Sequence, residues 1–267
     1  MLTRLTILGG GVFAILVLAL VSAAAAFGSA MPSVELAYMS YVAINPDIYL
    51  TDLPRSITRN LTDHPAYDAA PVWSPDGRWL AFVSDRDGFQ TVFLLAHGET
   101  QPRRLVDDGE IYVAPRWLSN SRQLVVRAPR QGAAVFYLVN HDGGDLTLVQ
   151  DGINPTTGRE IDLDLQVAGG TQARSPDGSL FAFMAFRGQR WGIFVSPQPH
   201  QQDARFLAEI GYFTEGLAWS PAGDHIAYTA YLDGMIDLFA VDVAKGEPQR
   251  LTSGRAIDTA PAWRPQP

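Results

Sequence analysis

The chain of 267 residues carries one motif five times, and this repeat limits what the chain can fold into. Each copy is centred on an apolar triplet; the triplets are Leu36–Tyr38, Leu80–Phe82, Leu124–Val126, Phe181–Phe183 and Ile226–Tyr228. Twelve residues after each central residue stands an aromatic side chain: Tyr49, Phe93, Tyr137, Phe194 and Phe239. A register kept over this length without gaps indicates one structural unit used repeatedly.

Each copy reads as four short strands, as the copy centred on Ala81 illustrates. Its first strand ends at Trp73, the turn Ser74-Pro75-Asp76-Gly77 follows, and further strands are predicted over 79–84, 91–95 and 103–106. Pro presets the backbone of such a turn and Gly accepts its positive φ. A four-stranded unit of this length is typical of one blade of a β-propeller. The spacing between the centres at 125 and 182 is longer than the others, which predicts an insertion near 151–170.

The two ends of the chain are expected to build one blade together. Tryptophans stand eight residues before three of the centres, at Trp73, Trp117 and Trp219, and Trp263 is a further one near the C-terminus. Ala37 lies where the centre after such a tryptophan belongs. The sequence therefore predicts an all-β fold, a five-bladed β-propeller of four-stranded blades in which N- and C-terminal strands share a blade and leave no open sheet edge. An open five-blade arc and a six-blade ring completed by dimerisation are the alternatives.

The first 30 residues are expected to precede the propeller, which would occupy 31–267. Residues 5–27 carry no charge, and an apolar stretch of this length can span a bilayer as a helix. The segment also resembles a secretory signal, with small residues at 23–26 and 28–30 as cleavage sites. It predicts a transmembrane signal-anchor or a signal peptide, and its length favours the anchor. A buried core helix is a further alternative, but a helix that is apolar on all sides has no place in a small β domain. Because Arg4 keeps the N-terminus in the cytoplasm, the propeller is expected in the periplasm or at the cell surface.

The repeat resembles a known family. The segments Trp73-Ser74-Pro75-Asp76-Gly77 and Ser84-Asp85-Arg86-Asp87-Gly88 are similar to the WD40-like, PD40-type repeat of TolB-like β-propellers, and Arg250-Leu251-Thr252 matches the ending of that repeat. The resemblance covers about residues 34–267 and departs at Leu118-Ser119-Asn120-Ser121, which replaces Ser-Pro-Asp-Gly, and at Arg174, which replaces Trp. It implies the propeller fold without one function, since such repeats serve scaffolds, sensors and peptidase propellers.

Composition argues against several classes of function. The chain has 20 Lys and Arg against 28 Asp and Glu, a formal net charge of −8, whereas a nucleic-acid binder needs a basic face. The absence of cysteine removes disulfides, thiolate metal sites and a cysteine nucleophile. The five histidines fall in different blades or on different faces, and neither a zinc-protease motif nor a nucleophile elbow occurs. No catalytic residue, metal or cofactor is predicted.

The candidate binding residues lie on loops at one face, where the connections from second to third and from fourth to first strands emerge. Function concentrates on such loops because a rigid scaffold holds them. The candidates before first strands are Asp68, Tyr112, Glu215 and Asp258, and those between second and third strands are Asp85, Arg86, Arg130, Arg187, Arg190, Tyr231 and Asp233. The insertion joins this face and adds Glu160, Asp162 and Asp164, in a segment that alternates acidic and apolar residues as an extra strand or a flap.

These features favour a binding module over an enzyme. The leading hypothesis is an exported propeller that presents its loop face to a protein or peptide partner, with membrane attachment through residues 5–27 if they are retained. The alternative is a carbohydrate-active enzyme with a carboxylate pair drawn from Asp68, Glu215 and Asp258 in the axial funnel, since glycosidases need two carboxylates about 5–10 Å apart. A sensor domain is a third option.

Overall fold

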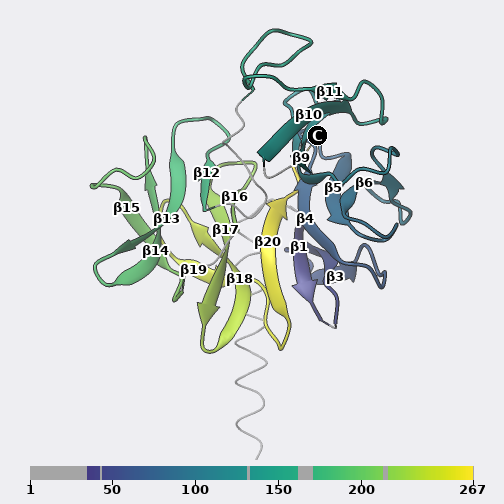
Figure 1. Cartoon of the computed structure of the whole chain (residues 1–267). Helices are drawn as coiled ribbons and strands as arrows, with labels where there is room; N and C mark the ends of the chain where they lie inside the picture. The colour runs from purple at the N-terminus through teal and green to yellow at the C-terminus, as the bar shows by residue number, and fades with distance from the viewer. Residues whose placement is uncertain (1–34, 43, 131–132, 162–170, 213–215, 267) are drawn as a thin grey trace, which may run out of the picture.

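The computed structural model describes residues 35–42, 44–130, 133–161, 171–212 and 216–266, which form five four-stranded antiparallel sheets (Figure 1). Blade 1 contains β20 (Ile257–Trp263), β1 (Glu35–Tyr41), β2 (Asp47–Asp52) and β3 (Ile57–Asn60). Blade 2 contains β4 (Asp68–Trp73), β5 (Trp79–Ser84), β6 (Thr91–Ala96) and β7 (Arg103–Arg104). The expected five blades of four strands are confirmed.

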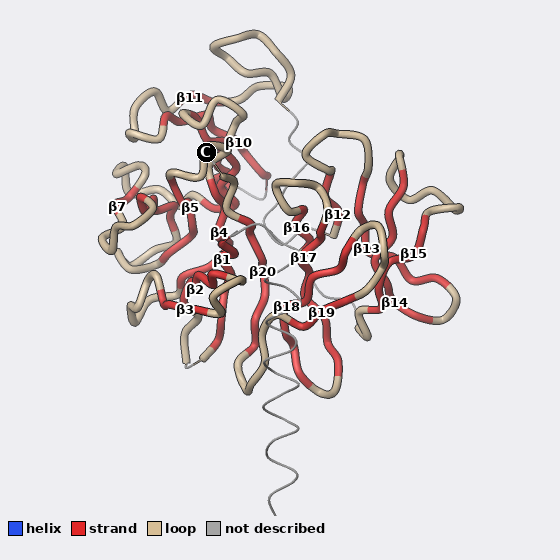
Figure 2. Tube along the Cα trace, turned by 180° about the vertical axis from the view of Figure 1, so that it is seen from behind, coloured by secondary structure: helices blue, strands red, loops and turns tan. Residues whose placement is uncertain are grey.

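Blades 3 to 5 follow the same order along the chain. Blade 3 contains β8 (Val113–Trp117), β9 (Gln123–Arg130), β10 (Ala133–Asn140) and β11 (Thr147–Leu148). Blade 4 contains β12 (Gln172–Arg174), β13 (Phe181–Arg187), β14 (Arg190–Ser196) and β15 (Arg205–Glu209). Blade 5 contains β16 (Leu217–Trp219), β17 (His225–Leu232), β18 (Met235–Asp242) and β19 (Pro248–Arg250). Figure 2 shows these short strands joined by loops throughout.

Both ends of the chain share blade 1, as the position of Trp263 predicts. Strand β20 pairs antiparallel with β1, with Leu36 opposite Trp263 and Ser40 opposite Asp258. The predicted signal or anchor segment, residues 5–27, lies outside the described residues. None of the described residues belongs to a helix that is long and apolar enough to cross a membrane.

The repeated Ser-Pro-Asp-Gly segment closes the turn between first and second strands through its side chains. The Ser74 hydroxyl accepts a hydrogen bond from the Trp79 amide at 3.0 Å and donates to Asp76 Oδ1 at 2.6 Å. Ser175 and Asp177 repeat this arrangement in blade 4, with the Leu180 amide as donor at 2.9 Å. The turn therefore explains the recurrence of these residues by local hydrogen bonding.

The Asp177 carboxylate should make the stability of the protein depend on acid pH. Hydrogen bonds from the Ser175 hydroxyl, and then from the Ser179 amide and hydroxyl, lower the pKa of Asp177 to about 2. A carboxyl group whose pKa is lower in the folded than in the unfolded state stabilises the fold above its unfolded pKa, and that contribution is lost as the pH falls. Asp177→Asn keeps an acceptor but cannot titrate, so it should lose less stability than the parent between pH 4 and pH 2. Urea unfolding at both values tests this, and equal losses would contradict it.

The tryptophans at the ends of first strands tie successive blades together. The indole of Trp117 donates to the carbonyl of Val72 at 3.3 Å, that of Trp219 to Ala173 at 3.0 Å, and that of Trp263 to Ala218 at 3.0 Å. Each bond runs from one blade to the first strand of the blade before it. At the junction of blades 1 and 2, the Arg264 guanidinium donates to the carbonyl of Gly77 at 2.8 Å instead.

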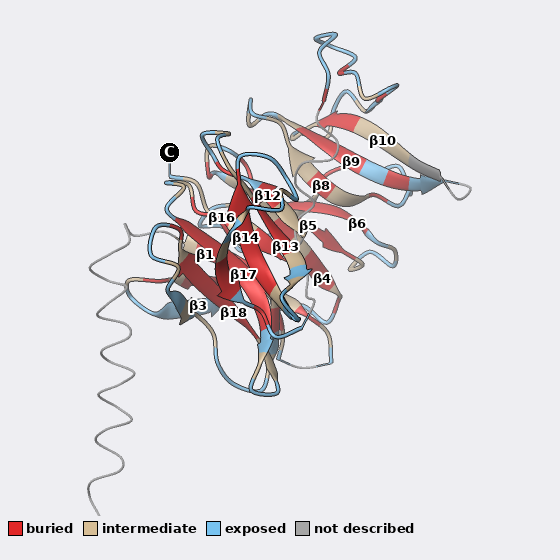
Figure 3. Ribbon diagram, turned by 90° about the vertical axis from the view of Figure 1, so that its left-hand side faces the viewer, coloured by how far each residue is buried: buried red, intermediate tan, exposed pale blue. Residues whose placement is uncertain are grey.

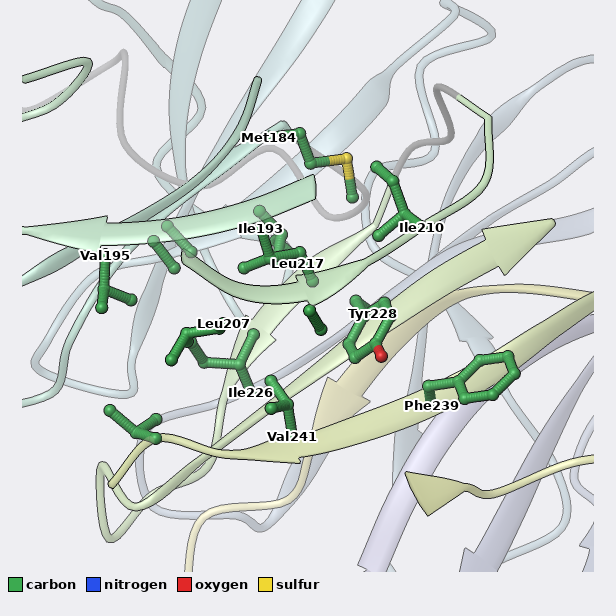
Figure 4. Close-up of a cluster of buried hydrophobic side chains, with 14 of the residues drawn as sticks. Met184, Ile193, Val195, Leu207, Ile210, Leu217, Ile226, Tyr228, Phe239 and Val241 are labelled. Carbon is green, nitrogen blue, oxygen red and sulfur yellow. The ribbon is translucent and has the colours of Figure 1, made fainter. Parts of the chain in front are cut away.

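Hydrophobic clusters fill the spaces between the sheets. One cluster joins blades 4 and 5 through residues such as Ile193, Leu217 and Tyr228 (Figure 4). Others join blade 5 to 1, 1 to 2 and 2 to 3. Figure 3 shows buried residues along the strands and exposed ones in many of the connecting loops.

The junction between blades 3 and 4 differs from the other four. No hydrophobic cluster of the described residues spans it, and in Figure 1 these two blades stand at the ends of the packed series 4–5–1–2–3. On blade 3, Ile161 of the insertion covers Val125 and Leu138. On blade 4, His200 of the connection after β14 packs on Phe183, with ring centroids 4.8 Å apart.

The sequence departure at Arg174 explains part of this difference. Arg174 stands where other blades carry the tryptophan, and its guanidinium donates to the carbonyl of Gly178 in its own turn at 3.0 Å. Among the described residues, Arg174 makes no hydrogen bond to the preceding blade. Strand sharing in blade 1 is as predicted, whereas the described residues do not pack blade 3 directly against blade 4.

Candidate functional site

The predicted binding residues that the structure describes lie in or beside the connections from second to third and from fourth to first strands, and the face where these connections emerge is here called the loop face. In blade 2 this face begins with a buried ion pair. Asp68 is 0 % exposed, and its two carboxylate oxygens accept hydrogen bonds from Arg86 at 3.1 and 3.0 Å. Arg86 also donates to the Ser84 hydroxyl at 3.0 Å. Asp68 and Arg86 thus form an ion pair in which both side chains are largely buried.

Arg86 belongs to a series that repeats in three blades. Arg86, Arg130 and Arg187 each stand five residues after the centre of their copy. Their guanidinium groups lie over the aromatic residue of the third strand, at 5.0 Å from the ring centre of Phe93, 5.8 Å from Tyr137 and 4.8 Å from Phe194. Such cation–π contacts stabilise exposed arginines modestly and fix their direction. The arginines of this series therefore have a structural role within their blades.

The surroundings of the three arginines differ beyond this shared contact. Arg130 approaches Glu110 at 3.4 Å, with both side chains about half exposed. The Arg187 guanidinium donates to the carbonyls of His200, Gln201 and Gln202. Arg130 is thus the most open of the three, while Arg187 fastens the connection that covers blade 4.

Asp258 occupies in blade 1 the position that Asp68 occupies in blade 2, but it has no arginine of the Arg86 type. It is 4 % exposed, and the Ser40 hydroxyl donates to it at 2.5 Å. Burial raises the pKa of Asp258, and the nearby carboxylate of Asp237 raises it further. Asp237 itself is ion-paired with Arg250. Asp258 is therefore a buried acid of the blade 5–blade 1 junction.

These positions bear on the enzyme hypothesis. Asp68 is neutralised by Arg86 and buried, and Glu215 lies outside the described residues. Glycoside hydrolysis needs two carboxyl groups that reach the substrate. Asp68 cannot serve as one of them while its ion pair with Arg86 is intact.

The remaining candidates are divided between framework and surface. Tyr112 is buried and donates to Asp108 at 2.7 Å, and Asp85 accepts a hydrogen bond from the Tyr67 amide at 2.8 Å. Glu160 forms an isolated bridge with Ile153 in the insertion. The exposed candidates are Arg190, Tyr231 and Asp233, while Asp162 and Asp164, like Glu215, lie outside the described residues.

The loop face also carries apolar side chains that sequence reasoning missed. Five of them form what we call the apolar arc over blades 5 and 1: Val42, Ile44, Tyr212, Tyr231 and Ile257, each exposed by 43 % or more. The rings of Tyr212 and Tyr231 meet edge to face, with centroids 6.4 Å apart. Pairing of Tyr41 with Ile257 sets Ile257 beside Val42. In blades 1 and 5 the arginine position of the repeat is held by Val42 and Leu232, which is the signal that could have revealed the arc.

A glycine brings the two tyrosines of the arc together. Gly211 has φ +71°, and a Cβ atom there would lie 2.0 Å from the carbonyl oxygen of Tyr231. The loop before blade 5 therefore lies directly against the β17–β18 connection. This contact fixes Tyr212 next to Tyr231.

The five four-stranded antiparallel sheets define a five-bladed β-propeller. The chain belongs to the TolB β-propeller family: the model of the PD40 family, described as the TolB beta propeller domain, matches residues 28–164. Among curated proteins, the Tol-Pal system protein TolB of Desulfosudis oleivorans is 27 % identical over 109 residues, which are 41 % of this chain and 25 % of that protein. The chain thus spans about a quarter of this relative's length in the match.

Solved structures resemble the chain at low identity. Hydrazine synthase of Kuenenia stuttgartiensis is similar with a TM-score of 0.53 and 10 % identity, over 88 % of this chain and 47 % of that one. TolB of Acinetobacter baumannii is similar with a TM-score of 0.45 and 20 % identity, over 87 % of this chain and 55 % of that one. The first likeness bears on the fold alone.

Proposed function

We propose that this chain is an exported binding module whose loop face docks a protein partner. The observation that carries the proposal is the apolar arc. Exposed apolar groups that gather on one face typically mark interaction sites, and Tyr is enriched in interfaces because it buries a large ring with little loss of conformational freedom. The arc also lies on loops of a rigid scaffold rather than on strands.

The partner class follows from the family and from the chemistry of the face. The curated relative is a Tol-Pal system protein, and we take the partner of this chain to be a protein of a similar system. Tyrosines and aliphatic side chains next to the exposed Asp233 suit a partner surface with an apolar centre and a polar rim. The apolar segment 5–27 supports a location of the propeller outside the cytoplasm, with the segment acting either as a cleaved signal peptide or as a membrane anchor.

Charged substitutions in the apolar arc test the proposal. The full chain with Tyr212→Asp and Tyr231→Asp should lose its partner, because two carboxylates would be desolvated at the centre of the interface. Loss of central aromatic contacts typically costs about 2 kcal/mol or more each, which corresponds to a complex roughly thirtyfold weaker for each residue lost. The measurement is quantitative mass spectrometry of proteins retained by the immobilised chain from a detergent extract of the native cells.

Ile57→Asp is the matched control. Ile57 is 59 % exposed and begins β3 at the opposite face, so a charge there leaves the arc intact. The parent and the Ile57→Asp variant should retain the same protein, and the double variant should not, at unchanged melting temperature. Retention by all three chains alike would show that the arc is not the docking site.

A further inference from the structure

A cavity of about 350 Å³ opens on blade 3 at the face opposite the loop face. It lies between the turn that joins β8 to β9 and the turn that follows β10. The residues that line it all carry polar side chains: Asn120, Arg122, Gln123, Asn140, His141 and Asp142. The volume falls within the usual range for small-molecule sites, about 300–1,000 Å³.

The cavity lies where the sequence departs from the repeat. Blades 2 and 4 close this turn with Ser-Pro-Asp-Gly, whereas blade 3 has Leu118-Ser119-Asn120-Ser121. Here Asn120 Oδ1 accepts hydrogen bonds from the amides of Arg122 and Gln123 at 3.0 and 3.1 Å. Asn120 Nδ2 donates to Gln123 Oε1 at 3.0 Å. The turn of blade 3 therefore fixes the Gln123 side chain through its Oε1 atom, and the Nε2 group of Gln123 can still donate to another partner.

The second wall is held by packing against blade 2. The His141 ring stacks on Trp79, with centroids 5.4 Å apart, and Arg103 lies over the same indole while donating to the His141 carbonyl. His141 Nδ1 is buried and has no hydrogen-bond partner among the described residues. Buried polar atoms are normally satisfied, so an unpaired one beside a cavity indicates a missing partner.

The polar groups of the lining include donors and acceptors that have capacity left. No hydrogen bond or ion pair with another described residue engages the Arg122 guanidinium. Asn140 uses its Nδ2 on Asp145 at 2.7 Å, which leaves its carbonyl oxygen to accept. Asp142 uses Oδ1 on the Gly144 amide at 3.0 Å, which leaves Oδ2. The lining itself carries one cation, Arg122, and one carboxylate, Asp142, so its own formal charges cancel.

We infer that this cavity binds a neutral polyhydroxylated ring, that is, one sugar residue. Each hydroxyl of a sugar both donates and accepts, which matches Arg122 and Gln123 as donors beside Asn140 and Asp142 as acceptors. A free phosphate or carboxylate would be repelled by the carboxylate of Asp142. An apolar ligand would displace water from the polar side chains of the lining without replacing its hydrogen bonds. The site is separate from the apolar arc, so it would act independently of the protein partner.

Saturation-transfer NMR on the full chain tests the inference with glucose, galactose and N-acetylglucosamine as probes, and calorimetry with inorganic phosphate tests the competing class. At least one sugar should receive saturation from the parent chain. Arg122→Ala with Gln123→Ala should weaken that binding by about tenfold or more, because two hydrogen bonds are lost, one of them from a charged donor.

Arg78→Ala is the matched control. Arg78 stands at the position of Arg122 in the neighbouring blade, outside the cavity, and its side chain is largely exposed. Unchanged sugar binding by this variant, together with the loss in the double variant, supports the inference. Three results overturn it: no sugar binds, the double variant binds as the parent does, or phosphate binds in place of sugar. A melting temperature for each variant shows that the fold is retained.

Discussion

Trp263→Ala is expected to lower the free energy of unfolding by about 3–5 kcal/mol, the usual cost of removing a buried Trp. Trp263 is buried in the cluster that joins blade 5 to blade 1, and its indole donates to the carbonyl of Ala218 at 3.0 Å. It also lies opposite Leu36 in the pairing of the two chain ends. Its loss therefore opens a cavity, breaks an inter-blade tie and weakens the strand pair that joins the termini.

Arg174→Ala is the control for this prediction. Arg174 occupies the same position of the repeat in blade 4, but it is exposed, and its contacts with described residues are a hydrogen bond to Gly178 in its own turn and a cation–π contact with Phe181 of the same blade. Its replacement should change stability by less than about 1 kcal/mol, as is usual for surface positions. Denaturant unfolding of both variants gives the comparison. A similar loss in the two would contradict the role given to Trp263.

Arg86→Met should destabilise the protein by about 3–5 kcal/mol, because it leaves the fully buried carboxylate of Asp68 without its cation. The effect arises from the stranded charge rather than from the strength of the pair. Adding Asp68→Asn to Arg86→Met removes that charge and should recover most of the loss. Urea unfolding of the single and double variants measures the coupling.

Arg130→Met is the comparison at the same position of the repeat in blade 3. Its ion pair with Glu110 is half exposed, so the expected loss is below about 1 kcal/mol. If Arg86→Met cost no more than Arg130→Met, or if the double variant were as unstable as the single one, the buried ion pair would not explain the recurrence of arginine here.

The blades could be predicted from sequence because one register decides most of the packing. The central apolar triplet, the aromatic residue twelve positions later and the tryptophan that precedes the second strand in four of the five blades supply much of the packing within and between sheets. Sharing of blade 1 by the two termini followed from Trp263 and Ala37 for the same reason. The junction between blades 3 and 4 could not be predicted in this way, because it depends on how Ile161 and His200 cover the two faces.

The sequence predicts where the loop face lies, but it does not predict which of its residues are buried and which are exposed. The sequence predicts Asp68 and Tyr112 at the surface because charge and hydroxyl groups favour solvent, yet each is buried and hydrogen-bonded to a nearby side chain. Asp68 meets Arg86 through the pairing of β4 with β5, and Tyr112 meets Asp108 through the conformation of the connection between β7 and β8. The apolar arc was missed because apolar residues in a repeat protein are first assigned to the core, and exposure of Ile44 or Tyr212 depends on loop conformation.

Site-specific photo-crosslinking in the native cells tests most directly the claim that the loop face docks a protein. A photoreactive phenylalanine analogue would replace Tyr212 in the apolar arc in one full-length chain and Ile57 on the opposite face in another. The account predicts a covalent adduct with a discrete protein from position 212 and none from position 57. No adduct from position 212, or the same adduct from both positions, would contradict it.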